Sequence, residues 1–117
     1  VNSEDGLDEI SPYSKTNIIQ INNNKISEIS VDPKKMDIKA DGFNNLLGDD
    51  AKFNANKMID IFKGLDNDFS KAVCLNSAAG LIVSEKCLNF PEAYEKSREH
   101  ILSGKTYKYL KSIQNDQ

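Results

Sequence analysis

A chain of 117 residues is long enough for one hydrophobic core. Its 15 Lys and Arg against 18 Asp and Glu give a net charge of −3, which argues against a nucleic-acid-binding module, because such modules carry a basic excess. No apolar run is long enough to span a bilayer, and the first residues lack the pattern of a signal peptide. Cys74 and Cys87 do not make a disulfide framework. We therefore expect a cytoplasmic protein that binds neither nucleic acid nor membrane.

The first half of the chain is expected to hold a loop and one β-hairpin. Residues 1–15 show no sustained period and read as a loop. Residues 16–21 and 25–31 are rich in β-branched side chains and predict two strands. The three asparagines at 22–24 suit the turn, because Asn tolerates positive φ. Residues 34–48 are expected to connect to the second half, with a short helical turn near 43–47.

Four helices are predicted in the second half. The first runs from 51 to 63 after an Asp cap at 49 or 50 and ends at Gly64. The second, 71–86, follows Ser70 as its cap and is apolar nearly all round, which is typical of a buried helix. The third opens at Asn89 and ends at Gly104, and the last covers about 105–113. The expected inward side chains are Ala51, Ala55, Met58, Ile59 and Phe62 in the first helix, Ala93, Tyr94, Ile101 and Leu102 in the third, and Tyr107, Leu110 and Ile113 in the last.

The predicted elements do not provide enough partners to cover their own apolar surface. A two-stranded hairpin is marginal by itself, and the apolar helix 71–86 needs more cover than three amphipathic helices and a hairpin supply. The chain also begins at Val1 without a methionine. We therefore expect a piece of a longer protein whose main sheet lies outside this sequence.

The strongest candidate for chemistry is the adjacent pair Asp8 and Glu9 in a glycine-containing loop. Two neighbouring carboxylates can present hard oxygen ligands to Mg²⁺, which commonly takes one or two carboxylates and completes its shell with water and phosphate oxygens. By chemistry alone the signal is weak, since acidic loops are common. The competing interpretation is a solvated acidic stretch.

Other candidate positions favour structural roles. Asp49 and Asp50 suit helix capping better than an anion or metal site, and His100 lies in a last helical turn where a cation is favourable. Asn76 is interpreted as a buried amide satisfied by backbone groups, with a contact near a ligand as the less favoured alternative. Arg98 is the only arginine, so any anionic ligand would depend on Lys, backbone amides or a metal ion. No glycine-rich phosphate loop is present.

Four motifs in this order resemble the anthranilate phosphoribosyltransferase family. Residues 1–11 are similar to its loop V-H-G-x-D-G-L-D-E-x-S, with Asn2-Ser3 in place of His-Gly. Residues 48–64 resemble its G-G-D-x-x-x-N-A helix and closing L-x-G. Residues 75–81 resemble L-N-A-A-x-x-L, and residues 93–110 resemble A-x-E-x-I-x-S-G-K-A-x-x-x-L. The resemblance covers essentially the whole chain and about the last third of a typical member.

The resemblance implies an α/β fold, with residues 1–117 forming the C-terminal portion of the large α/β domain of the nucleoside phosphorylase/phosphoribosyltransferase type. The helical N-terminal domain and the phosphate loop would lie upstream of Val1. It also implies an enzyme of tryptophan biosynthesis that joins phosphoribosyl pyrophosphate to anthranilate and uses Mg²⁺ held by Asp8 and Glu9. A homodimer through the N-terminal domain is implied as well.

Two other functions are compatible with the same residues. One is a phosphoribosyltransferase paralogue with another acceptor, and the other is a non-catalytic binding or assembly module in which Asp8 and Glu9 are solvated. The chain offers no candidate for a catalytic side chain of its own, and its substrate-binding residues are left open. We expect these 117 residues alone to have no transferase activity.

Overall fold

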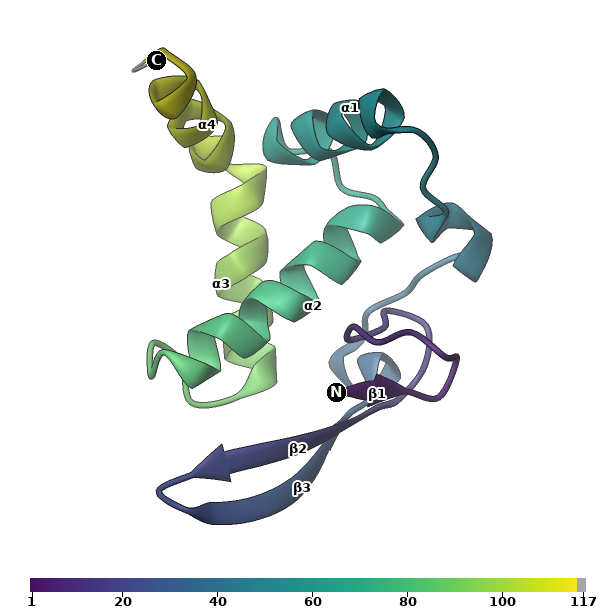
Figure 1. Cartoon of the computed structure of the whole chain (residues 1–117), viewed down its shortest axis with the longest axis vertical. Helices are drawn as coiled ribbons and strands as arrows, with labels where there is room; N and C mark the ends of the chain where they lie inside the picture. The colour runs from purple at the N-terminus through teal and green to yellow at the C-terminus, as the bar shows by residue number, and fades with distance from the viewer. Residues whose placement is uncertain (116–117) are drawn as a thin grey trace.

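The computed structural model describes residues 1–115 as a small antiparallel sheet followed by helices (Figure 1). The sheet order is β1-β2-β3. The strands are β1 (Asn2–Ser3), β2 (Thr16–Asn22) and β3 (Lys25–Val31). Two 3₁₀ helices, η1 (Pro33–Met36) and η2 (Phe43–Leu46), connect them to α1 (Ala51–Phe62), α2 (Asp68–Val83), α3 (Phe90–Leu102) and α4 (Lys105–Asn115). The predicted α/β class, hairpin and four helices are confirmed.

The β2–β3 hairpin turns tightly through two asparagines. Asn22 pairs with Lys25, so Asn23 and Asn24 form a two-residue turn, and their φ angles are 48° and 61°. A turn with two left-handed residues matches the twist of the flanking strands. One face, which carries Thr16, Ile18 and Val31, contributes to the core, whereas Ile21 on the other face is 72% exposed.

Side-chain caps begin the first three helices. Asp50 Oδ1 accepts from the Phe53 amide at 2.7 Å at the start of α1, as predicted. The prediction that Ser70 caps α2 is wrong. Asn67 is the cap, and Ser70 is the third helical residue, whose hydroxyl accepts from the Asn67 amide at 2.9 Å. The capping box is reciprocal, which is why a serine three residues inside the helix resembled a cap in the sequence.

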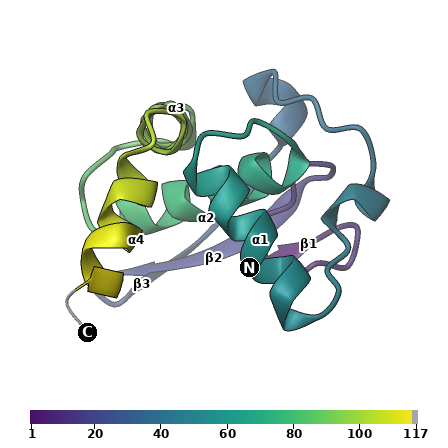
Figure 2. The same ribbon diagram turned by 90° about the horizontal axis from the view of Figure 1, so that it is seen from above.

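The core lies where α2 and α3 pack together above the sheet, and Figure 2 shows α3 end-on beside α2. Its helical members are Ile61, Cys74, Leu75, Ala78, Ala93, Tyr94 and Ile101. Helix α2 buries one stripe only, and Val83 at its end is 82% exposed. The prediction that this helix is buried all round is therefore wrong for this chain.

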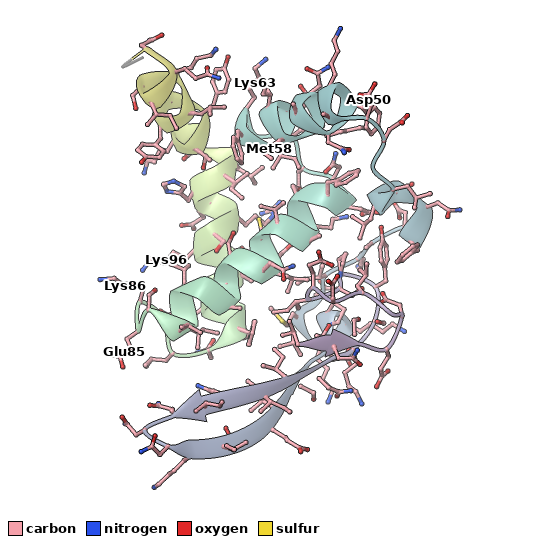
Figure 3. The ribbon with its side chains drawn as sticks, in the orientation of Figure 1. Asp50, Met58, Lys63, Glu85, Lys86 and Lys96 are labelled. Carbon is pink, nitrogen blue, oxygen red and sulfur yellow. The ribbon has the colours of Figure 1, made fainter. Side chains whose placement is uncertain are left out.

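Two predictions of inward faces are wrong in part. In α1 the buried residue is Ile61, whereas Ala51 and Ala55 are exposed and Met58, labelled in Figure 3, is 53% exposed. The helix is therefore rotated about its axis from the expected stripe. In α4 Tyr107 and Leu110 are half-buried, but Ile113 is exposed. Within residues 1–115, none of the helices combines the length and the apolar character needed to cross a membrane.

Candidate functional site

The candidate site is the N-terminal loop between β1 and β2, which carries Asp8 and Glu9. Both side chains are exposed. The pKa of Glu9 is raised by hydrogen bonding with the Asp8 carboxyl, with burial and the Asp8 charge adding to the effect. Neighbouring carboxylates repel each other when both are ionised, and a bound cation relieves that repulsion.

One side of the loop is closed by hydrogen bonds to Asp5. Ser11 Oγ donates to Asp5 Oδ2 at 2.5 Å, and the Leu7 amide donates to Asp5 Oδ1 at 3.3 Å. Partial burial raises the pKa of Asp5, but the hydrogen bonds, led by that from Ser11, outweigh it and lower the pKa overall. Gly6 has a φ of 93°, a conformation that favours glycine, so the chain can double back immediately before Asp8.

The far side of the loop is anchored through Ser11. Its amide donates to Thr16 Oγ1 at 3.1 Å, and its Oγ accepts from the Tyr13 amide at 3.0 Å. Both Ser11 and Thr16 are buried, so these polar groups are matched inside the protein. The segment after Glu9 is therefore a fixed part of the core, even though it has no regular secondary structure.

Helix α2 contacts this loop through Asn76. The Ile10 amide donates to Asn76 Oδ1 at 2.9 Å, and Asn76 Nδ2 donates to the Ile10 carbonyl at 3.0 Å. The predicted hydrogen bonding of Asn76 to backbone groups is confirmed, but the residue is half-buried rather than buried. The pattern of the sequence did not indicate that those groups belong to the residue directly after Glu9.

Asp68 is a second junction between the loop and α2, and the sequence reasoning missed it. The carboxylate is 4% exposed and accepts from Tyr13 Oη at 3.1 Å, Asn45 Nδ2 at 2.9 Å and Lys71 Nζ at 2.9 Å. The Asp41 amide donates to it as well, at 2.9 Å.

These contacts determine the protonation of Asp68 and Tyr13. Burial acts to raise the pKa of Asp68, but hydrogen bonds from Asn45, Lys71 and the other donors lower it well below its usual range. Burial and the hydrogen bond to Asp68 raise the pKa of Tyr13 to about 12. An aspartate in the first turn of a helix is usually a cap or a dipole partner, so sequence alone offered no signal for this role.

The residues present fit a magnesium ion that binds together with a phosphate ligand. Within the described residues no group of three or more potential ligands among Asp, Glu, His and Cys converges, so a closed protein cage is not formed there. Asp8 and Glu9 supply oxygen ligands from an exposed position. Mg²⁺ commonly takes one or two carboxylates and completes its shell with water and phosphate oxygens, so ligands of this kind suit it.

The other candidates from the sequence lie away from this loop. Asp49 and Asp50 lie at the start of α1, where Asp50 caps the helix. Figure 3 labels Asp50 at this end of α1. His100 is exposed in the last turn of α3. Arg98 Nη2 pairs with Asp66 Oδ2 at 2.5 Å. Cys74 and Cys87 are buried free thiols, and burial raises the pKa of Cys74 to about 11.

Comparison with known proteins supports the class of fold that the geometry defines. The model for the glycosyl transferase family, a/b domain, matches residues 1–107. The structure aligns with that of an anthranilate phosphoribosyltransferase from Saccharomyces cerevisiae in complex with 4-fluoroanthranilate, with a TM-score of 0.81 and 24% identity, over 94% of this chain and 32% of the other. At that identity the match concerns the fold alone.

The chain belongs to the glycosyl transferase family, a/b domain. It is 73% identical over 98% of its length to an anthranilate phosphoribosyltransferase from Pelagibacter ubique, and 34% identical over 94% to one from Dictyoglomus thermophilum. The chain spans only 35% and 33% of the length of these two relatives. The resemblance predicted from the four motifs is confirmed.

Proposed function

We propose that this chain is the C-terminal portion of the α/β domain of an anthranilate phosphoribosyltransferase. The complete protein would transfer the phosphoribosyl group from phosphoribosyl pyrophosphate to anthranilate and release pyrophosphate, in tryptophan biosynthesis. The observation that carries the proposal is the 73% identity to the Pelagibacter ubique enzyme, which extends across 98% of this chain. A dimer and a cytoplasmic location are further expectations for the complete protein.

In this reaction the chain would supply the ligands of the metal ion that binds the pyrophosphate leaving group. Asp8 and Glu9 would ligate Mg²⁺, and the chemistry that Mg²⁺ supplies when bound is neutralisation of the charge that develops on pyrophosphate. Their exposed position leaves room for the phosphate oxygens of a substrate. The hydrogen bonds of Asp5 to Ser11 and to the Leu7 amide fix the chain on both sides of Asp8 and Glu9.

The test is the double variant Asp8→Asn/Glu9→Gln in the complete enzyme. Loss of both charges should lower Mg²⁺-dependent turnover by more than about 100-fold while the fold stays intact, because the metal ligands are lost. Turnover is measured against Mg²⁺ concentration, and folding is checked by circular dichroism.

Glu4→Gln is the matched control. Glu4 lies in the same loop and pairs with Lys15 at 2.9 Å, so its loss removes an acidic charge without touching the pair. This variant should keep most of the activity. Wild-type turnover in the double variant would refute the metal assignment.

The two alternative functions give different results in binding experiments. For a paralogue with another acceptor, the complete protein would bind phosphoribosyl pyrophosphate with Mg²⁺ but would not turn over anthranilate. For a non-catalytic module, the amide signals of Asp8 and Glu9 would not respond to Mg²⁺ in nuclear magnetic resonance spectra, even with pyrophosphate present. The 117 residues alone should show no transferase activity, and measurable turnover from them would contradict that prediction.

A further inference from the structure

Among the described residues of α2, Asn76 is the only one whose side chain forms hydrogen bonds with the backbone of the N-terminal loop. Its amide meets both the N–H and the C=O of Ile10, at 2.9 and 3.0 Å, as a neighbouring strand would. Its Nδ2 also donates to the Ala72 carbonyl at 2.9 Å, one turn back in the same helix. All three bonds together fix the amide's orientation, including which end carries oxygen.

The position of this grip matters because Ile10 directly follows Glu9. The Ile10 N–H belongs to the peptide unit that it shares with the Glu9 carbonyl, and that unit is planar. Holding the Ile10 amide therefore restricts the backbone of Glu9 and the direction in which its side chain leaves the chain. On the other side of the pair, the bond from Ser11 to Asp5 closes the loop at 2.5 Å.

We propose that Asn76 is a positioning residue for the candidate metal site: its double hydrogen bond to Ile10 holds Asp8 and Glu9 in the arrangement that binds a divalent cation with a pyrophosphate ligand. The inference rests on the proposed function. It assigns to α2 a role in the site through a side chain that binds the loop backbone.

A purely structural role explains less of this geometry. Asn is a poor residue for a helix interior, because its side chain competes for backbone hydrogen bonds. The Ile10 side chain is already 1% exposed and anchors the segment by burial. The bonds from Asn76 add orientation to a position that packing already secures, and orientation is what a pair of metal ligands requires.

The test uses Mn²⁺ as the metal probe and the complete enzyme, with pyrophosphate as the phosphate ligand. Binding of Mn²⁺ is followed by electron paramagnetic resonance, and the melting temperature is recorded for each variant. Asn76→Ala removes both bonds to Ile10, and we expect Mn²⁺ to bind about 10-fold more weakly, as for other residues that orient metal ligands. Excess metal should restore much of the lost turnover.

Asn89→Ala is the matched control. Asn89 caps α3 by accepting from the Glu92 amide at 3.0 Å, at the turn between α2 and α3 where Figure 3 places Glu85 and Lys86, so the same substitution costs stability away from the loop. It should lower the melting temperature and leave Mn²⁺ affinity unchanged. A lower melting temperature with unchanged Mn²⁺ affinity in Asn76→Ala would overturn the proposal.

Two further variants keep the test decisive. If Asn76→Ala does not fold, Asn76→Asp is measured in the same way. It retains an acceptor for the Ile10 amide but sets a carboxylate oxygen against two carbonyls, so weaker Mn²⁺ binding is again expected and unchanged binding again refutes the inference. The double variant Asp8→Asn/Glu9→Gln is the reference. If it also binds Mn²⁺ as tightly as the wild type, the proposed metal pair is wrong. If only the double variant loses Mn²⁺ binding and the Asn76 variants keep it, the metal pair stands and only the role of Asn76 is wrong.

Discussion

The N-terminal loop and the β2–β3 hairpin, which are adjacent in the chain, are held in opposite ways. The loop has almost no regular secondary structure, yet Ile10 and Ser11 near its end are buried, and the Ile10 backbone is bonded to the side chain of Asn76 in α2. The hairpin has a complete ladder from Thr16 to Asn22, yet most of its residues are exposed. Figure 1 shows the loop gathered against the start of the hairpin, whose tip extends away.

A segment can therefore have regular backbone hydrogen bonds without being firmly attached to the rest of the protein, and it can be firmly attached without having them. A ladder of backbone bonds sets the register of two strands, but it does not attach them to the protein. The loop is attached to the protein by side-chain amides, hydroxyls and carboxylates that bond to its backbone groups. Such bonds form because each buried backbone group needs a partner. The candidate metal ligands belong to the segment that is attached.

The largest expected effect comes from removing the loop's apolar anchor. Ile10→Ala should lower the free energy of unfolding by about 2–4 kcal/mol, because a large buried side chain leaves a cavity. Ile21→Ala, at an exposed hairpin position, should change it by less than about 0.5 kcal/mol. Urea unfolding of both variants in one background measures the contrast, and equal losses would contradict it.

The next effect concerns Asp68, which joins Tyr13 of the loop to α2. Asp68→Asn should lower the free energy of unfolding at neutral pH by about 1–3 kcal/mol, because a charged acceptor with several donors is lost. The pKa of Asp68 is lower in the folded protein than in the unfolded chain. Its contribution is therefore present above the unfolded value of about 3.9 and is lost as the pH falls below it.

The measurement for Asp68 is the difference in unfolding free energy between wild type and variant from neutral to acid pH. That difference should shrink as the pH falls below the unfolded pKa. Asp60→Asn, at an exposed position of α1, is the control for loss of a charge and should show a small difference throughout. A gap between wild type and Asp68→Asn that does not change with pH would speak against the carboxylate's role.

The smallest effect lies in the hairpin turn. Asn24 has a φ of 61°, so Asn24→Ala should cost about 1 kcal/mol of unfolding free energy from the left-handed conformation. Asn24→Gly should stay within about 0.5 kcal/mol of wild type, because glycine adopts this conformation freely. Thermal unfolding of the two variants gives the comparison, and an alanine variant as stable as the glycine variant would show that the turn is formed differently.

Local patterns predicted the elements well because the responsible interactions are local. The asparagines of the turn, the Asp50 cap and Gly64 act within a few residues, and each was correctly placed. Gly64 has a φ of 103°, and a side chain there would also meet the Leu102 carbonyl at 3.0 Å. The cap of α2 was misplaced because Asn67 and Ser70 bond to each other, and either suits the sequence pattern.

Sequence by itself determined the family, the order of the elements and the candidate pair Asp8 and Glu9, because these depend on residue identity at short spacing. The tertiary structure alone decided which faces α1 and α2 bury and what holds the loop, whereas the buried Ala93, Tyr94 and Ile101 of α3 were predicted from the sequence. Asn76 and Ile10 are separated by 66 residues, and Asp68 and Tyr13 by 55, so no local period connects them. Such contacts exist only once the helices have packed, since each polar group then bonds to whatever partner the packing brings within reach.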